Sequence, residues 1–420
     1  MVGMPCCGKS SIARRLVQFL SWQGLRVKVF NAGRTRRESR DESSSPLSAT
    51  LFDTSNAEGQ ALKDQIAMNT LDDLLVWLDS SGDIAFFDAT NSTKKRRNAV
   101  TNRVKAYGAE HNPGQFGLVF LESLCDDPVI LEASLLNKVR TSPDFAGMSE
   151  EEALASLKCR MSNYESVYEP LQQSEGSFIK VMNMCSYVVA NRVFGRLTRT
   201  VLPFVCSIHT SQRPIFLAAL VPRRSEKEYV RIGDQGQIGH KDDALERDAL
   251  DGELAKRLAA WVQRQEALNG QHFCVLGSTL PTALEAATAV AEVSKCSVTH
   301  QSLLNPLNRG PCPELEGEDE SHLDFRARFP FGESYADLVH RLEPSLLEIE
   351  ASTEPVLVIS HATPCRALRA YFLGLPVMKC MEAASSPGAS ALADVIPCVL
   401  ELNLNRGHFE ETVHFLEPAP

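Results

Sequence analysis

The chain has 420 residues, of which 44% are hydrophobic and 23% charged, and this length predicts two domains because single cores stop growing near about 250–300 residues. The formal net charge of −10 argues against bulk attraction to nucleic acid, and no apolar run approaches the ~20 residues of a membrane span. We therefore expect neither partner. Scattered cysteines and a start without a signal peptide favour free thiols in a cytoplasmic protein.

The first half alternates helical and extended patterns. Apolar spacing predicts helices over 10–22 and 62–78, and short apolar runs predict strands over 27–30, 84–87 and 117–121. Such alternation is typical of a parallel sheet covered by helices on both faces. We expect a P-loop NTPase-type α/β domain over residues 1–205.

The first residues satisfy the pattern G-x-x-x-x-G-K-[ST], from Gly3 to Gly8, Lys9 and Ser10. In a phosphate-binding loop the glycines let backbone N–H groups approach phosphate oxygens, the lysine reaches the β- and γ-phosphates, and the hydroxyl binds Mg²⁺. With Ser11, these residues are the predicted site for ATP and Mg²⁺. The alternative, a chance glycine-rich turn, is disfavoured by the amphipathic pattern that follows. Only two residues precede the loop, so either the chain starts late or the sheet begins with a stub.

Two cysteines, Cys6 and Cys7, lie inside this loop. One interpretation is that Lys9 and the helix N-terminus lower a thiol pKa there and make the loop sensitive to peroxide. The other is that both are small residues that fit a tight loop.

A carboxylate and several basic residues complete the first half. Asp88 ends the strand predicted at 84–87, where it either holds Mg²⁺ or takes a proton from an attacking hydroxyl. The alternative is that Asp88 is a helix N-cap or a surface carboxylate. Basic residues gather at 34–37 and 94–97, with Arg160 further on. Each alone is typical of a solvated face, but together they indicate a second phosphorylated ligand, because guanidinium groups grip phosphate in a bidentate fork.

In this order the motifs resemble those of the bifunctional 6-phosphofructo-2-kinase/fructose-2,6-bisphosphatases. Residues 30–37 are similar to that family's F-N-x-G-x-Y-R-R, and residues 87–97 are similar to its F-D-A-T-N-T-T-x-x-R-R. The resemblance implies transfer of the γ-phosphoryl group of ATP to the 2-hydroxyl of fructose 6-phosphate. The product would be a regulatory bisphosphate that controls glycolysis and gluconeogenesis.

The resemblance also implies residue roles. Lys9, Asp88 and Arg96 would be catalytic, with Ser10 and Asp88 at the metal. The sugar phosphate would be bound by Arg36, Arg37, Thr90, Arg96, Arg160 and Tyr164. Two positions depart from the family pattern: Thr35 replaces a tyrosine, and a lysine is out of register by one, leaving Lys138 or Arg140 in its place. A kinase for another sugar phosphate and a non-catalytic ATP or sugar-phosphate sensor are the alternatives.

The second half, residues 213–420, again alternates. Helices are predicted at 254–266, 281–293 and 335–350, and strands at 215–221, 273–276 and 356–360. Residues 328–335 and 356–361 resemble the same family's histidine phosphatase module. We therefore expect a phosphoglycerate-mutase-like α/β domain.

This module lacks the histidine that its chemistry needs. The family carries R-H-G-E after the first strand, whereas no histidine occurs here from Thr210 to Gly239. His361, Arg366 and Glu314 remain as a residual site, with Glu314 as the candidate general acid. We expect no bisphosphatase activity; a truly bifunctional enzyme is the alternative. The half either binds an anion, with Arg223 or Arg224 assisting, or is kept for stability or dimerisation, and we expect a homodimer.

Overall fold

Two units, each with its own strands, make up the chain. The computed structural model describes residues 1–38, 56–111, 116–209, 213–220, 241–270, 272–294, 296–310, 324–381, 398–405 and 408–417. One unit contains Met1–Ser21 and Leu25–Thr210, and the other contains Trp22–Gly24 and Ser211–Pro420. Glu314, Arg223, Arg224 and the residues that follow the first strand of the second half lie outside the described residues.

The first unit begins with the helix and strands that the sequence predicts. Helix α1 (Lys9–Trp22) buries its apolar stripe, and α3 (Ala57–Ser80) begins at Asn56, whose side chain accepts a hydrogen bond from the backbone N–H of Gly59. Strands β1 (Val27–Asn31) and β2 (Ile84–Asp88) pair in parallel. These four predictions are therefore confirmed, with α3 longer than expected.

A second group of strands lies beside β2. It contains β3 (Phe120–Leu124), β4 (Phe178–Met182) and β5 (Tyr187–Asn191). The pairing of β3 with β4 is parallel, but that of β4 with β5 is antiparallel. The expectation of an all-parallel sheet is wrong at this edge, because a tight hairpin joins β4 directly to β5.

The predicted strand at 117–121 begins three residues later than expected. Phe116 and Leu118 pack against the apolar core of the helices rather than pairing with a strand. Pairing begins at Phe120, which lies opposite Phe178 of β4. The apolar run at 117–121 therefore indicated which residues are buried. The start of β3 depends on where its partner strand β4 begins to pair with it.

The two residues before the phosphate loop lie between the two groups of strands. The backbone N–H of Val2 donates to the carbonyl of Leu121 at 2.7 Å, and Ser123 donates back to Val2 at 2.9 Å. On the other side, the amino group of Met1 donates to the carbonyl of Phe87 at 2.9 Å. The stub therefore joins β2 to β3 and delivers the loop to the carboxyl ends of both strands.

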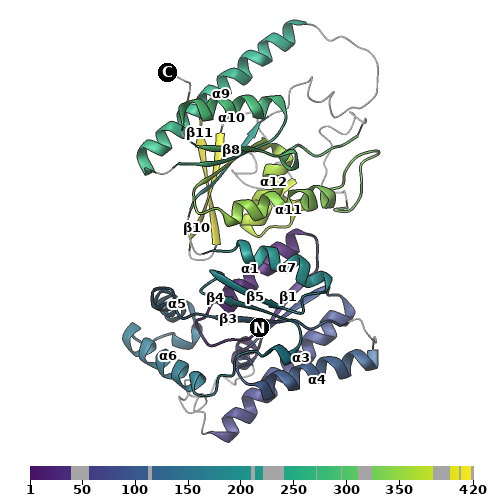
Figure 1. Ribbon diagram of the computed structural model, residues 1–420, viewed down its shortest axis with the longest axis vertical. Helices are drawn as coiled ribbons and strands as arrows, with labels where there is room; N and C mark the ends of the chain where they lie inside the picture. The colour runs from purple at the N-terminus through teal and green to yellow at the C-terminus, as the bar shows by residue number, and fades with distance from the viewer. Residues whose placement is uncertain are drawn as a thin grey trace. The chain divides into compact units, whose positions relative to one another are not determined.

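Helices cover both faces of these strands. The remaining helices of the unit are α2 (Ala32–Glu38), α4 (Lys94–His111), α5 (Pro128–Thr141), α6 (Glu150–Glu165) and α7 (Arg196–Ser207). Figure 1 shows α1 and α7 on one side of the strands and α3 and α4 on the other. Phe19 of α1 stacks on Phe204 of α7 with ring centroids 4.2 Å apart. The predicted α/β fold of this half is confirmed.

The second unit is built on a six-stranded sheet of order β11-β10-β6-β9-β7-β8. Its strands are β6 (Ile215–Leu220), β7 (Cys274–Gly277), β8 (Ser297–His300), β9 (Val356–His361), β10 (Cys398–Asn405) and β11 (His408–Phe415). Strands β6 to β9 pair in parallel, and β10 and β11 add an antiparallel edge.

Helices surround this sheet as well. They are α9 (Lys241–Asn269), α10 (Pro281–Val293), α11 (Tyr335–Ala351), α12 (Ala362–Leu373) and α13 (Val377–Met381). Figure 1 shows α9 and α10 on one side of the sheet and α11 and α12 on the other. Phe216, Trp261 and Phe273 meet in the core between β6 and α9. The predicted elements of this half are thus confirmed, α10 with the bounds expected.

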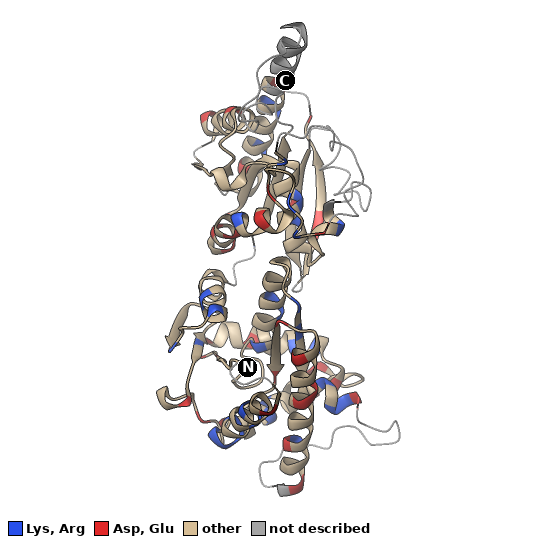
Figure 2. Cartoon of the chain, turned by 90° about the vertical axis from the view of Figure 1, so that its right-hand side faces the viewer, with Lys and Arg blue, Asp and Glu red and all other residues tan. Residues whose placement is uncertain are grey.

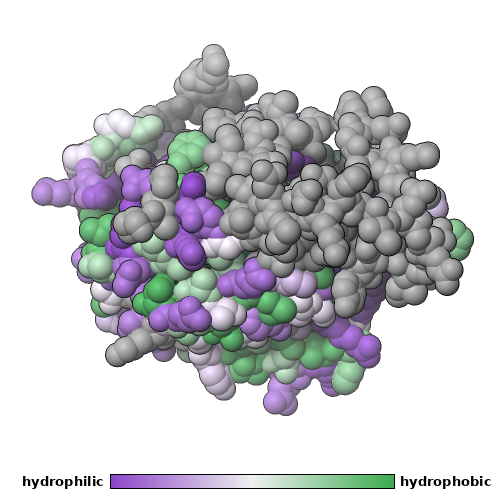
Figure 3. Space-filling view, turned by 90° about the horizontal axis from the view of Figure 1, so that it is seen from above, coloured by the Kyte–Doolittle hydropathy of each residue, from purple (hydrophilic) through white to green (hydrophobic). Residues whose placement is uncertain are grey.

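Charge and hydropathy are mixed along the described chain. Figure 2 shows basic and acidic residues interspersed, and on the face in Figure 3 hydrophilic and hydrophobic residues alternate. Among the helices that the structure describes, none combines the length and apolar character needed to cross a membrane. Any strong positive potential must therefore come from local clusters such as the one described next.

Candidate active site

The phosphate loop has the backbone that its glycines allow. Gly3 has φ +138° and Gly8 has φ +84°, values that side chains rarely adopt. A Cβ at Gly3 would clash with the carbonyl of Ser123, and one at Gly8 would clash with the thioether of Met184. The loop can therefore approach its neighbours only with glycine at both positions, as the motif predicts.

Lys9 curls over this loop. Its ammonium donates to the carbonyl of Gly3 at 2.9 Å and to that of Met4 at 2.5 Å. Burial lowers the pKa of Lys9, while the negative charge of Asp88 opposes that effect. The first residue of α1 thus supplies a buried amine beside the loop, where a bound phosphate would offer it a stronger partner than two carbonyls.

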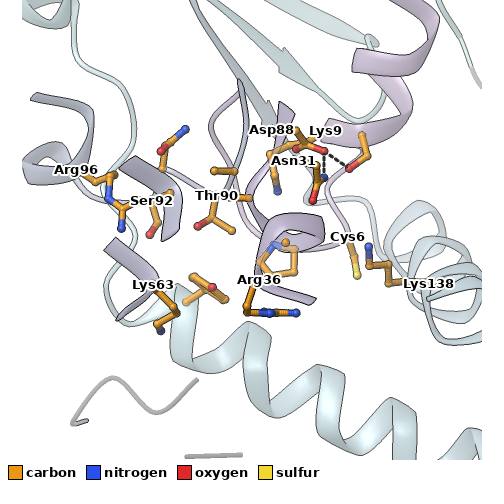
Figure 4. Close-up of a pocket in the computed structure, with 18 of the residues that line it drawn as sticks. Cys6, Lys9, Asn31, Arg36, Lys63, Asp88, Thr90, Ser92, Arg96 and Lys138 are labelled. Atoms are coloured by element: carbon orange, nitrogen blue, oxygen red, sulfur yellow. Dashed lines mark hydrogen bonds between the residues drawn. The ribbon is translucent and has the colours of Figure 1, made fainter. Parts of the chain in front are cut away.

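Three side chains meet at the carboxyl ends of β1 and β2. The hydroxyl of Ser10 donates to Asp88 Oδ2 at 2.8 Å, and the side-chain amide of Asn31 donates to the same oxygen at 2.6 Å (Figure 4). The parallel register pairs Asn31 with Asp88 directly, which explains their contact. A hydroxyl and a buried carboxylate are the oxygen ligands that Mg²⁺ prefers, so Ser10 and Asp88 fit the predicted metal site.

A cavity of about 570 Å³ extends from this loop. Its lining includes predicted residues from both ends of the site: Gly8, Lys9, Ser10, Ser11, Arg36, Asp88, Thr90, Arg96 and Tyr164. Figure 4 shows Lys9, Asn31 and Asp88 in one part of it and Lys63 and Arg96 in another. The structure therefore brings most of the predicted nucleotide and sugar-phosphate residues into one space, the exceptions being Gly3, Arg37 and Arg160.

The second part of the cavity is positively charged. Arg96 forms an ion pair with Asp64, and the hydroxyl of Tyr164 is hydrogen-bonded to Thr90. Burial raises the pKa of Tyr164, which keeps its hydroxyl protonated as a neutral donor. Arg36 also lines this part. A phosphorylated ligand would thus meet two guanidinium groups and neutral hydroxyl groups there.

Two of the predicted arginines lie behind the cavity. Arg37 and Arg160 are absent from its lining; each forms an ion pair with Asp144, at 3.5 Å and 3.3 Å respectively. Arg36 also pairs with Asp144, at 3.0 Å. Of these three arginines, only Arg36 reaches the cavity directly.

Lys63 is a site residue that the sequence analysis missed. It lies on α3 and lines the cavity with its ammonium 6.0 Å from the ring centroid of Tyr164. Its pKa is lowered by burial and then by the charges of Arg36 and Arg96, which shows that all three cations share one region. A lysine on an amphipathic helix carries no distinguishing sequence signal, so only the fold reveals it.

Lys138 and Arg140 are the two candidates for the family lysine that is out of register, and they lie in different places. Lys138 lines the cavity and lies near Cys6, whereas Arg140 forms an exposed ion pair with Glu150 at 2.9 Å. Figure 4 shows Lys138 beside Cys6 of the loop. Lys138 is therefore the basic residue at this side of the site.

The two arginines of the basic run at 94–97 lie in different environments. Arg97 is 1% exposed and pairs with Glu175 at 2.6 Å, and its Nη1 donates to the carbonyls of Asn91 and Glu169. It therefore stabilises the loop that follows Asp88. Arg96, by contrast, lines the cavity.

Of the two interpretations of the loop cysteines, the reactive thiol is not supported. Burial raises the pKa of Cys6 to about 11 and also raises the pKa of Cys7; Lys9 opposes both shifts without overcoming burial. Both thiols are therefore protonated at neutral pH. The structure supports the other interpretation, in which small residues fit a tight loop.

The residual site of the second unit centres on His361. This residue is 1% exposed, and its Nε2 lies 3.1 Å from the hydroxyl of Ser278. Burial lowers the pKa of His361 to about 4, so the imidazole is neutral at neutral pH. Leu220, the last residue of β6, lies opposite His361 in the parallel register, and Arg366 lies on the second turn of α12.

These features define a P-loop α/β unit with a cavity beside its phosphate loop, joined to an α/β unit with a buried histidine at a strand end. The family model for 6-phosphofructo-2-kinase matches residues 1–212, and the model for the histidine phosphatase superfamily (branch 1) matches residues 239–390. The chain belongs to the 6-phosphofructo-2-kinase/fructose-2,6-bisphosphatase family. The predicted resemblance and both fold classes are thereby confirmed.

Individual relatives agree with this assignment. A 6-phosphofructo-2-kinase/fructose-2,6-bisphosphatase of Arabidopsis thaliana is 33% identical over 395 residues, covering 90% of this chain but 49% of that protein, so the chain spans about half its length. The 6-phosphofructo-2-kinase/fructose-2,6-bisphosphatase 4 of Rattus norvegicus is 33% identical over 402 residues, covering 90% of this chain and 79% of that protein. A solved mycobacterial glucosyl-3-phosphoglycerate phosphatase is similar at 16% identity and a TM-score of 0.32, covering 50% of this chain and 100% of that one, a likeness too low to add to the family match.

Proposed function

We propose that this chain is a 6-phosphofructo-2-kinase, which transfers the γ-phosphoryl group of ATP to the 2-hydroxyl of fructose 6-phosphate. The observation that carries the proposal is the shared cavity, with the phosphate loop and Asp88 in one part and Arg36, Arg96 and Lys63 in the other. Two phosphorylated ligands can thus face each other across a short space. Family membership supports the identity of both.

The residues of the loop would bind and orient ATP. The backbone N–H groups around Gly8 and the N-terminus of α1 would bind phosphate oxygens, and Lys9 would exchange its two carbonyl partners for phosphate. Mg²⁺, held by Ser10 and Asp88 when it is bound, would neutralise charge on the phosphates. Asp88 would hold the metal or accept the proton of the attacking hydroxyl.

The remaining residues would position the sugar. Arg36, Arg96 and Lys63 would bind its phosphate, while Thr90 and Tyr164 would donate hydrogen bonds from neutral hydroxyl groups. Catalysis would come from positioning and charge neutralisation, and no covalent nucleophile would be required.

For the second unit we propose a loss of bisphosphatase activity. The sequence has no histidine from Thr210 to Gly239, the stretch that contains the strand β6 and the residues following it. His361 cannot replace this nucleophile while it is buried against Ser278. The unit would retain a structural or anion-binding role, and a homodimer in the cytoplasm remains a proposal from the sequence.

The test is a coupled assay of the purified chain with Mg·ATP and fructose 6-phosphate. ADP release and fructose 2,6-bisphosphate formation are followed together, with Lys9→Ala as the inactive variant and the exposed Lys95→Ala as its matched control. Formation of the bisphosphate by the wild type and Lys95→Ala, but not by Lys9→Ala, would support the kinase. ATP binding without product, in a panel that includes other hexose phosphates, would instead support a sensor.

A further inference from the structure

A carboxylate lies among Arg36, which lines the cavity, and the two arginines behind it, Arg37 and Arg160. Asp144 belongs to the short 3₁₀ helix η2 (Pro143–Phe145). Its two oxygens accept hydrogen bonds from Arg36 Nη2 at 3.0 and 3.3 Å, and Oδ2 accepts another from Arg160 Nη1 at 3.3 Å. Arg37 Nη1 lies 3.5 Å from Oδ1. One carboxylate therefore contacts arginines from two helices that are distant in the sequence.

This cluster is largely buried. The side chains of Arg36, Arg160 and Asp144 are 12%, 14% and 10% exposed. Burial by itself would raise the pKa of Asp144, but the charges of the arginines outweigh it and lower that pKa. The carboxylate is therefore ionised at neutral pH. Without it, the guanidinium groups of Arg36 and Arg160 would repel each other in a poorly solvated space, with the more exposed Arg37 nearby.

The members of the cluster differ in whether they line the cavity. Arg36 lines the cavity, whereas Asp144, Arg37 and Arg160 do not. The guanidinium group of Arg160 also lies over the ring of Phe145, 5.0 Å from its centroid, which fixes η2 against α6. Asp144 is thus placed to act on a ligand only through Arg36.

Resting on the proposed function, we infer that Asp144 is a positioning residue, which orients the guanidinium group of Arg36 for the 6-phosphate of the sugar. Arg37 and Arg160 hold Asp144 in place and balance its charge. A guanidinium group is planar, so a carboxylate that fixes two of its hydrogen-bond directions also fixes the plane in which it meets a phosphate. The binding site is then preorganised before the sugar arrives.

The experiment is a steady-state analysis of Asp144→Asn and Asp144→Glu. Asp144→Asn is expected to raise KM for fructose 6-phosphate by about tenfold or more and to leave KM for ATP within about twofold, because only the sugar end is disordered. Asp144→Glu keeps the charge and is expected to recover part of the loss. The matched control is Asp72→Asn, which removes a half-exposed ion pair with Arg103 on the same unit.

Three outcomes would overturn the inference. An unchanged KM for fructose 6-phosphate in Asp144→Asn would show that Arg36 needs no orienting carboxylate. An equal rise in both KM values would indicate general damage, which circular dichroism and thermal melting would detect independently. Additive effects of Asp144→Asn and Arg36→Lys in a double-mutant cycle would show that the two residues act separately.

Calorimetric titration separates this inference from the proposed function. Fructose 6-phosphate and inorganic phosphate are titrated into the wild type and Asp144→Asn. If the wild type binds phosphate but forms no bisphosphate, the kinase proposal fails, and weaker phosphate binding by Asp144→Asn still supports positioning. If the wild type makes the bisphosphate and both proteins bind both ligands equally, the kinase stands and the role of Asp144 is rejected.

Discussion

The two units place a polar side chain at the same topological position but surround it with different groups. Asp88 ends β2 and His361 ends β9, both buried at the carboxyl end of a parallel strand. Asp88 contacts Ser10 and Asn31 beside a phosphate loop, the surroundings on which the kinase proposal rests. His361 contacts Ser278, and the sequence around the neighbouring strand β6 has no histidine from Thr210 to Gly239. A fold therefore supplies a location, and activity depends on whether the chemical partners have been retained.

The largest expected effect is the loss of kinase activity when the site around Lys9 and Asp88 is altered. Lys9→Ala and Asp88→Asn are each expected to lower kcat by about 10³-fold or more, since they remove charge compensation in the transition state. Stopped assays of bisphosphate formation measure this. Activity above a tenth of the wild type in either variant would mean that the site does not work as described.

Arg97 tests whether the segment after Asp88 depends on buried charge. Arg97→Ala leaves Glu175 buried without its partner and is expected to lower the free energy of unfolding of the first unit by about 3–5 kcal/mol. Denaturant unfolding measures this effect. Arg103→Ala, which breaks the half-exposed pair with Asp72, should change the free energy of unfolding far less, because solvent screens an exposed pair. Equal losses would show that burial does not distinguish the two pairs.

The stability of the second unit should depend on pH because His361 is buried in its neutral form. The pKa of His361 is about 4 in the folded chain and about 6.5 in the unfolded chain. Between pH 4 and pH 6.5 the unfolded state therefore binds the proton more readily than the folded state. Stability should therefore fall as the pH drops from about 6.5 towards 4 and be independent of this group above that range. Limited proteolysis across this range follows the unit, with His361→Gln expected to show a shallower dependence. An unchanged slope in that variant would assign the effect to other groups.

A smaller effect is expected at Lys63. Lys63→Ala should raise KM for the sugar phosphate by roughly three- to tenfold, whereas Lys63→Arg should remain close to the wild type because it keeps the charge. The exposed Lys95→Ala serves as the control. If KM for ATP rose instead, Lys63 would belong to the nucleotide end of the cavity.

The smallest effect tests whether the two sites are independent. His361→Gln is expected to change kcat and KM of the kinase by less than about twofold, since nothing in the proposed mechanism uses His361. Kinetic assays at pH 7.5 measure this. A larger change would show that the second unit contributes to the kinase reaction.

Local patterns in the sequence determined much of the fold and the nucleotide end of the site. The helix predicted at 281–293 matches α10 because an apolar stripe begins at a proline suited to the first turn and ends before a polar residue. The phosphate loop is equally local, since its glycines, Lys9 and Ser10 are contiguous. The missing histidine of the second half is also a fact of the sequence alone.

Tertiary structure decided the features that depend on partners far away in the chain. Asn31 reaches Asp88 through the register of two strands, Asp144 gathers arginines from two helices, and Lys63 faces the cavity because of how α3 packs. The raised pKa of Cys6 likewise follows from burial, which no neighbouring residue in the sequence could indicate. Propensity and spacing act over a few residues, whereas burial and charge depend on the whole fold. The end of the cavity lined by Arg36, Lys63 and Arg96 was therefore less predictable than the phosphate loop.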